Sequence, residues 1–147
     1  MATWTEFETS APDLARATRS RFEATKHHVL ATLRKDGSPR VSGTEVSFLG
    51  AELTLGSMPG SVKSRDLLRD VRFALHANPG DGSMTGGDSK ISGLAILSPG
   101  IAGDANQPGA DYFRLDILEV VHTEVQGAEL VIRVWHPGEE VRETRRT

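Results

Sequence analysis

The sequence predicts a mainly β fold in which short antiparallel strands close into a barrel, with an N-terminal helix and a short helix after the third strand. Two observations carry this prediction. Seven apolar runs of strand length recur between turn signals such as Asp36-Gly37. The chain also contains 15 glycines, a share that favours many tight turns over a helical bundle. Closure into a barrel then leaves few unpaired sheet edges.

The first expected elements are a helix and three strands. The helix covers residues 10–26, with Ser10 as its N-cap, Pro12 in its first turn and a modest apolar stripe. The Asp36-Gly37 pair is a strong signal for a hairpin turn. Three strands are expected to form an antiparallel meander, at residues 28–34, 40–48 and 52–57.

A short helix over residues 62–70 is expected to precede four further strands. The apolar alternation changes phase inside residues 112–125, which indicates a bulge, and Gly93 is expected to mark a bend. The four strands are expected at residues 72–77, 90–98, 112–125 and 129–136, with loops at residues 78–89 and 99–111. We expect one domain over residues 1–147, with its core at 26–136 and a frayed, charged tail at 137–147.

Composition excludes several classes of protein. The sequence has no cysteine, so disulfides, thiolate catalysis and cysteine-ligated metals are excluded. The net charge of −3 argues against a nucleic-acid-binding domain. We find no signal-peptide pattern and no apolar run of membrane-spanning length, so we expect a cytoplasmic protein without membrane association. The histidine spacing predicts no metal site, and no Gly-x-Ser-x-Gly nucleophile motif occurs.

The stretch GSMPGSVKSRDLLRD, residues 56–70, places Lys63 in the first turn of a helix. Helix N-termini carry a partial positive charge and unpaired N–H groups, so they favour anions over ammonium groups. A bound phosphate would explain the lysine, with serine hydroxyls and a close-approaching Gly60 beside it. The alternative is a solvated surface lysine paired with Asp66 or Asp70. A Walker A loop does not fit, because its glycine spacing and parallel sheet are missing.

The order of these elements resembles the flavin-binding split β-barrel family, the pyridoxamine 5′-phosphate oxidase-like and flavin–deazaflavin oxidoreductase proteins. The matching segments are LATLRKDGSPRVSGTEVSF, LTLGSMPGSVKSRDLLRD, RFALHA and LVIRVWHPG, within residues 26–136. The pairing of DGSPRVS with SVKSRDLLRD is the most specific part. The resemblance implies an antiparallel split barrel that acts as a homodimer.

In that family the flavin phosphate lies at the start of the helix. The resemblance therefore implies a phosphate end and a ring end. The phosphate end would consist of Ser57, Met58, Ser61, Val62 and Lys63. The ring end would consist of Ser42, Gly43 and Thr44. No side chain stands out as an obligatory acid or base, so the catalytic residues stay unknown.

The sequence departs from the vitamin-processing enzymes at several points. Ser42 stands where those enzymes tend to carry an arginine, Val62 stands at an often basic position, and the C-terminal arginine motif is missing. The resemblance implies an oxidoreductase that uses FMN to pass hydride or electrons to a small-molecule acceptor. The alternative cofactor is the deazaflavin F-420, whose polyglutamate tail needs extra cationic surface such as Arg65 and Lys90.

Two alternatives of another class remain. One is a non-catalytic flavin- or tetrapyrrole-binding barrel, in which a histidine such as His76 would ligate haem. The other is a barrel that has lost its ligand, against which the Ser61-x-Lys63 helix start argues. Trp135, on the last expected strand, is read as a core or interface residue, with stacking near a partner subunit's flavin as the alternative.

Overall fold

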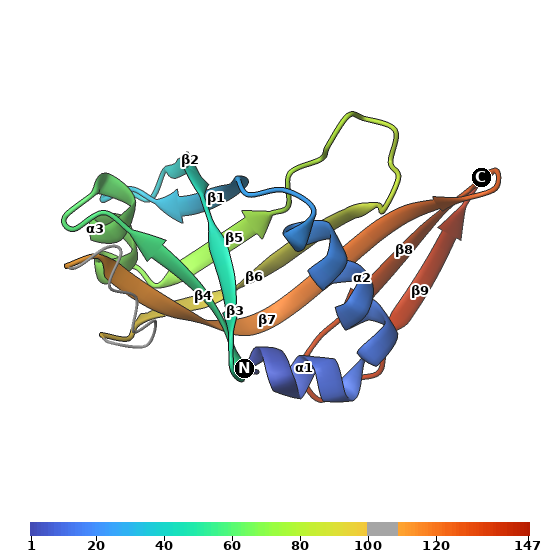
Figure 1. Cartoon of the computed structure of the whole chain (residues 1–147), viewed down its shortest axis with the longest axis horizontal. Helices are drawn as coiled ribbons and strands as arrows, with labels where there is room; N and C mark the ends of the chain where they lie inside the picture. The colour runs from blue at the N-terminus through green and yellow to red at the C-terminus, as the bar shows by residue number, and fades with distance from the viewer. Residues whose placement is uncertain (100–108) are drawn as a thin grey trace.

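The computed structural model describes residues 1–99 and 109–147, which form three helices and nine strands (Figure 1). The helices are α1 (Trp4–Ser10), α2 (Pro12–Glu23) and α3 (Val62–Arg69). The strands are β1 (His28–Leu33), β2 (Pro39–Thr44), β3 (Val46–Leu49), β4 (Glu52–Ser57), β5 (Arg72–His76), β6 (Asp88–Leu97), β7 (Asp111–Gln126), β8 (Glu129–Trp135) and β9 (Arg142–Arg146).

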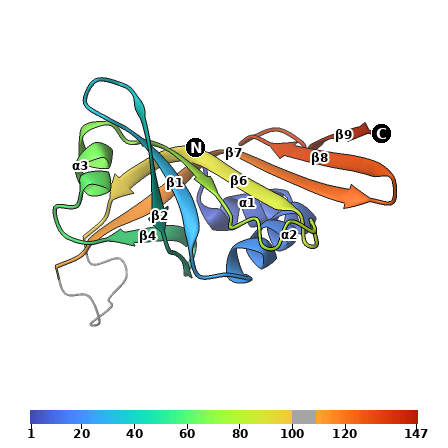
Figure 2. The same cartoon turned by 90° about the horizontal axis from the view of Figure 1, so that it is seen from above.

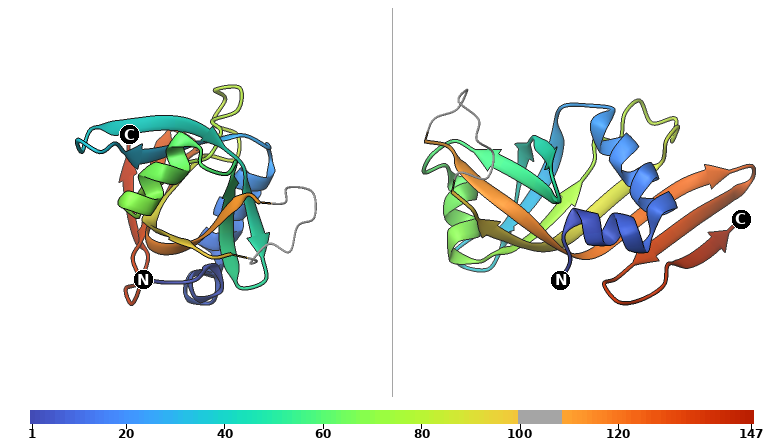
Figure 3. Two further views of the ribbon diagram at one scale, coloured as in Figure 1. Left: turned by 90° about the vertical axis from the view of Figure 1, so that its left-hand side faces the viewer. Right: turned by 60° about the horizontal axis from the view of Figure 1, so that its bottom comes forward.

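Seven strands curl into a barrel. Their hydrogen-bonded order is β2-β1-β5-β6-β7-β4-β3, and every pairing in it is antiparallel. The order begins with β2 and ends with β3, which follow one another in the chain through Glu45. The chain passes from β2 to β3 through Glu45, but no ladder between β2 and β3 is present in the described residues, so the barrel is not closed by hydrogen bonds, unlike the closure expected from the sequence. Figure 3 shows the strands surrounding the barrel axis, with α3 at one end.

The long strand β7 belongs to both the barrel and an extension. Its first part pairs with β4 and its last part pairs with β8, which in turn pairs with β9. The register against β6 shifts between Ser92 and Gly93, so that Leu118 is the extra residue on β7. A Cβ on Gly93 would lie 1.9 Å from the Asp116 carbonyl oxygen. The predicted bulge in this strand is confirmed, and Gly93, where the sequence predicts a bend, is the β6 residue at which the register shifts.

The helices α1 and α2 pack where the barrel meets the extension (Figures 1 and 2). Trp4 lies edge-on to Phe7 and Phe48, with ring centroids 5.1 and 4.7 Å apart, and Phe7 packs on Trp135. The Trp135 indole donates a hydrogen bond to Ser10 Oγ at 3.1 Å. Trp135 is therefore a core residue, as first read from the sequence, and its position does not suit stacking on a ligand.

The structure corrects four details of the sequence analysis. An additional helix, α1, begins after the Thr3 cap, and α2 begins at Pro12 without a side-chain cap, so Ser10 is not an N-cap. The expected strand 40–48 is divided at Glu45, because its first half pairs with β1 and its second half with β4. The expected frayed tail contains β9, which is held by its ladder with β8. Most of the expected loop at 99–111 lies outside the described residues.

Candidate functional site

A polar pocket of about 320 Å³ lies where β2, β3, β4 and the loop leading into α3 meet. We call it the α3 pocket. Its lining consists of His27, Gly43, Thr44, Glu45, Ser47, Gly56, Ser57, Met58, Lys63 and Tyr112. Residues far apart in the sequence meet here because β2 and β3 continue into one another and β4 pairs with β7. The volume is at the lower end of the range of about 300–1,000 Å³ that is typical of small-molecule sites.

Serine side chains organise the start of α3. Ser61 is the N-cap, and its hydroxyl accepts a hydrogen bond from the Ser64 backbone N–H at 3.2 Å. The Ser57 and Ser61 hydroxyls lie 2.5 Å apart, which ties the end of β4 to the cap. The first turn of α3 contains no acidic residue, and the Asp111 carboxylate lies just before the cap, where it accepts a long hydrogen bond of 3.4 Å from the Gly60 N–H.

Lys63 extends from this first turn to β2. Its Nζ donates a hydrogen bond to the Gly43 carbonyl oxygen at 2.9 Å. Burial lowers the pKa of the Lys63 ammonium from its ordinary value, and the Glu45 carboxylate partly opposes that shift. The positive charge is thus held beside a helix end that is itself positive, an arrangement that an anion would stabilise.

The surface-lysine alternative is wrong about the partners of Lys63. Asp66 forms ion pairs with Arg40 and Arg69, at 2.7 and 2.9 Å. Asp70 pairs with Arg72, whose hydrogen bonds lower the pKa of the Asp70 carboxyl to about 2. Both carboxylates therefore form ion pairs with arginines, and the Lys63 ammonium donates its hydrogen bond to a backbone carbonyl oxygen.

Two buried hydroxyls near this junction lack partners. Ser42 Oγ on β2 and Ser64 Oγ on α3 are buried and make no hydrogen bond to any residue that the structure describes. They belong to the two elements that Lys63 joins. Buried hydroxyls are normally satisfied, so these donors have unused capacity for a polar ligand group. Neither hydroxyl lines the α3 pocket, so the donors at the pocket are Ser57, Ser61 and Lys63. These are donors of the kind that phosphate oxygens accept from, and they fit the phosphate end of a flavin.

The structure gathers most of the site residues suggested by the sequence resemblance. Five line the α3 pocket: Gly43, Thr44, Ser57, Met58 and Lys63. Ser61 joins them through its contact with Ser57. Ser42 and Val62 do not line it, since Ser42 is turned inward as one of the unpaired buried hydroxyls and Val62 borders a different pocket.

Sequence reasoning missed five residues of the lining: His27, Glu45, Ser47, Gly56 and Tyr112. Tyr112 enters because β7 pairs with β4 so that Tyr112 stands opposite Gly56. A Cβ on Gly56 would lie 2.9 Å from the Tyr112 ring, so only glycine lets the ring approach β4 this closely. A glycine inside an apolar strand was the available signal for such a close approach.

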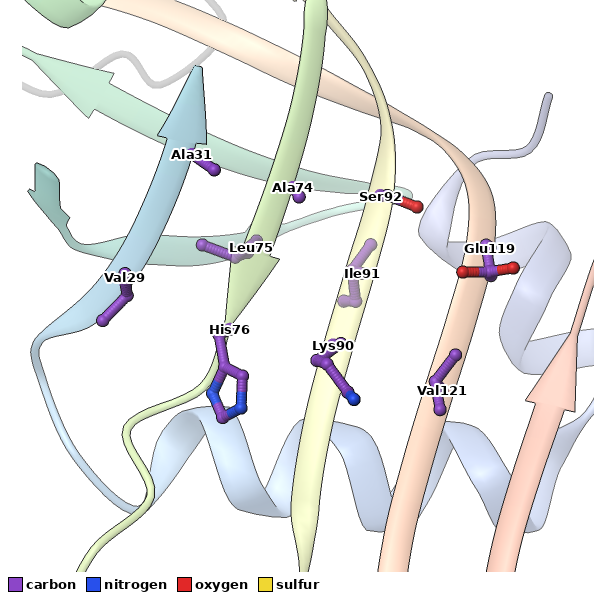
Figure 4. Close-up of a pocket in the computed structure, with 10 residues that line it drawn as sticks. All are labelled: Val29, Ala31, Ala74, Leu75, His76, Lys90, Ile91, Ser92, Glu119 and Val121. Carbon is purple, nitrogen blue, oxygen red and sulfur yellow. The ribbon is translucent and has the colours of Figure 1, made fainter. Parts of the chain in front are cut away.

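A second pocket, apolar and about 330 Å³ in volume, lies on the outer face of the barrel (Figure 4). We call it the outer groove. One cross-strand row on this face is Val29, His76, Lys90 and Val121. The next row is Ala31, Ala74, Ser92 and Glu119, whose mostly small side chains leave the face hollow. Lys90 thus lies in this groove while Arg65 lies on α3, so these two cations do not form one surface.

The fold matches many solved structures. PhzG from Burkholderia lata 383, in complex with tetrahydrophenazine-1-carboxylic acid, superposes with a TM-score of 0.67 at 16% identity, covering 92% of this chain and 89% of that one. A pyridoxamine 5′-phosphate oxidase-related, FMN-binding protein from Nostoc punctiforme PCC 73102 superposes with a TM-score of 0.66 at 13% identity, covering 93% of this chain and 96% of that one. This chain has the split-barrel fold.

A third split barrel, a haem-binding protein from Mycobacterium smegmatis, gives a TM-score of 0.54 at 16% identity and covers 88% of this chain and 86% of that one. No protein-family model and no curated protein matches the sequence. The solved structures that match this fold thus include one described as FMN-binding and one described as haem-binding. Within the described residues, no helix is long and apolar enough to cross a membrane.

Proposed function

We propose that this split barrel binds FMN in the α3 pocket and acts as an oxidoreductase on a small-molecule acceptor. The observation that carries the proposal is Lys63, a partly buried ammonium at a helix start that forms no ion pair with a carboxylate of the described residues. The FMN phosphate would accept hydrogen bonds from Lys63, Ser57 and Ser61. The FMN-binding protein of the same fold supports this choice of ligand.

The ring of the flavin would lie along β2 and β4, toward Gly43, Thr44 and Tyr112. Gly43 has no atom within 4 Å of the position of a Cβ, so this wall is open. A pocket of about 320 Å³ encloses only part of a cofactor the size of FMN. A second subunit would complete the enclosure, and we therefore propose a homodimer.

The outer groove is the face that suits the subunit contact. It is apolar, and Val29 and the neighbouring Val41 are 40% and 69% exposed. Burying such side chains against a second copy would stabilise the dimer by the hydrophobic effect. Lys90 and Glu119 on the same face offer opposite charges for a two-fold-symmetric contact.

The bound flavin would supply the hydride and electron chemistry. The protein's own residues would bind and orient it: Lys63 and the two serines hold the anionic end, and Tyr112 and Gly43 shape the ring wall. Glu45 lies within 3.7 Å of Lys26 Nζ and 3.8 Å of His27 Nδ1, so the mouth of the pocket carries both signs of charge. A pocket mouth that is polar and carries charges of both signs suits a polar substrate.

The test is a set of parallel titrations of the purified protein with FMN, riboflavin and F-420, followed by flavin fluorescence and absorbance. The proposal predicts saturable FMN binding and much weaker riboflavin binding, because riboflavin lacks the phosphate. Saturable binding of F-420 without FMN binding would replace FMN by the deazaflavin, which carries a phosphate too. Equal affinity for FMN and riboflavin would contradict a phosphate site at Lys63.

Haem binding is the second candidate, and His76 is the observation in its favour. The ring lines the apolar outer groove, and its Nδ1 donates to the Ala77 carbonyl oxygen at 2.6 Å. That hydrogen bond leaves the Nε2 lone pair available to a metal. A haemin titration with a Soret shift that His76→Ala abolishes would support this candidate, and an unchanged shift in that variant would contradict it.

A further inference from the structure

A third pocket, of about 440 Å³, lies between the β1–β2 hairpin and α3, which are neighbours in Figure 2. It shares no lining residue with the α3 pocket. We call it the basic pocket; it is lined by Arg34, Lys35, Asp36, Arg40, Val62, Arg65, Asp66 and Arg69. Five cations and two carboxylates give a local charge of +3, in a chain whose net charge is −3.

The two carboxylates of the basic pocket are already occupied. The Asp66 side chain is only 3% exposed and accepts hydrogen bonds from Thr32 Oγ1, Arg40 Nε and Arg69 Nη2, at 2.7, 2.7 and 2.9 Å. Asp36 accepts from the backbone N–H and the hydroxyl of Ser38 in the hairpin turn, at 2.9 and 2.6 Å. The acidic groups therefore serve the fold and leave excess positive charge facing solvent.

Asp66 also fixes the orientation of two guanidinium groups. Arg40 is held through Nε alone, and Arg69 is held by Asp66 and by the Leu33 carbonyl oxygen at 3.1 Å. The remaining N–H groups of Arg40 have no acceptor among the described residues. Guanidinium forks that are oriented in advance bind phosphate and carboxylate groups in pairs of hydrogen bonds, at a reduced entropic cost.

Of the other three cations, Arg34 donates a hydrogen bond from Nε to the Pro39 carbonyl oxygen at 3.5 Å. Arg34, Lys35 and Arg65 are exposed and form no ion pair within the described residues. Like charges gathered around one hollow repel each other, and an anion of several charges would relieve that repulsion. We propose that the basic pocket binds a multivalent anion through phosphate or carboxylate oxygens, as a site separate from the flavin pocket.

The proposal is tested with inorganic tripolyphosphate and citrate, titrated by calorimetry into the protein at about 0.15 M salt, where the Debye length is about 8 Å. The tripolyphosphate titration tests recognition of phosphate, and the citrate titration tests recognition of carboxylate. The pocket variant is Arg34→Ala/Arg65→Ala, which changes only exposed side chains. The matched control is Arg16→Ala/Arg146→Ala, which removes the same charge from α2 and β9, away from α3 (Figure 1). A third variant, Lys63→Ala, reports on the α3 pocket.

We expect saturable binding of at least one probe, weakened about tenfold or more in the pocket variant and within about twofold of wild type in the control and in Lys63→Ala, because charge-assisted hydrogen bonds are lost only in the pocket variant. Absence of binding by both probes at this salt concentration would overturn the proposal. Equal losses of affinity in the pocket and control variants would also overturn it, because binding would then depend on the overall charge of the protein and not on the basic pocket. Loss in Lys63→Ala alone would assign the anion to the α3 pocket and also overturn it.

Discussion

Lys63 Nζ lies 2.9 Å from the Gly43 carbonyl oxygen, so a charged side chain joins α3 to β2 across the α3 pocket. A neutral carbonyl accepts one hydrogen bond but does not neutralise the ammonium. In a partly buried position that ammonium is poorly hydrated, which is the cause of its lowered pKa. The proposed FMN phosphate would supply the missing counter-charge.

The first prediction concerns the contribution of Lys63 to binding. Lys63→Ala is expected to weaken FMN binding about tenfold or more, because a charge-assisted hydrogen bond contributes about 1.5–3 kcal/mol. Riboflavin serves as the control ligand, and its affinity is expected to change less than threefold. Fluorescence titrations of both variants with both ligands measure this. An equal loss for FMN and riboflavin would show that the lysine shapes the pocket without contacting phosphate.

The second prediction concerns the subunit contact at the outer groove. Val121→Glu places a carboxylate at the β7 edge of this face, where burial against a second copy would be costly. Light scattering is expected to give a dimer for the wild type and a monomer for the variant, with weaker FMN binding in the monomer. Val125→Glu, at an exposed position near the end of β7, is the control. A wild-type monomer with FMN bound would contradict the dimer.

The third prediction concerns the β-bulge. Gly93→Ala is expected to lower the free energy of unfolding by about 3 kcal/mol or more, because the new methyl group would collide with the Asp116 carbonyl oxygen. Gly43→Ala is the control, since its Cβ would meet no atom within 4 Å. That change is expected to stay within about 1 kcal/mol. Urea denaturation compares the two, and a tolerated Gly93→Ala would place the bulge elsewhere.

The fourth prediction concerns acid stability. His122 is 1% exposed, and its Nδ1 lies 2.5 Å from Ser89 Oγ. Burial, followed by the Arg133 charge, lowers the pKa of His122 from 6.5. The unfolded chain then binds more protons, so stability is complete above pH 6.5 and falls as the pH drops through the lowered pKa.

Urea unfolding at pH 8 and pH 5 measures this loss. His122→Asn keeps a polar atom near the position of Nδ1 and is expected to lose less stability at pH 5 than the wild type. Part of the loss is expected to remain, because burial also lowers the pKa of His28. The exposed His27→Asn is the control. An unchanged pH dependence in His122→Asn would mean that protonation of this ring is not what destabilises the protein in acid.

The sequence was most informative where structure is determined locally. The Asp36-Gly37 turn predicted the β1–β2 hairpin, and the observed register centres on that turn. The phase slip in β7 predicted the bulge, because side chains alternate along a strand. The start of α3 carried its cap and its lysine within a few residues.

The elements that were missed depend on contacts between distant residues. The strand β9 is charged and wholly exposed, so its sequence lacks an apolar pattern, and only its ladder with β8 makes it a strand. Tyr112 enters the α3 pocket through the register of β7 against β4, which no local pattern encodes. The basic pocket likewise forms only when the hairpin and α3 come together.

The crystal structure of the protein with FMN tests the central claim most directly. The account predicts that a phosphate oxygen lies within about 3.2 Å of Lys63 Nζ, at hydrogen-bond distance. It also predicts contacts from the Ser57 and Ser61 hydroxyls to the same phosphate. A phosphate bound elsewhere, with Lys63 still bonded to the Gly43 carbonyl oxygen and no ligand in the α3 pocket, would contradict the account.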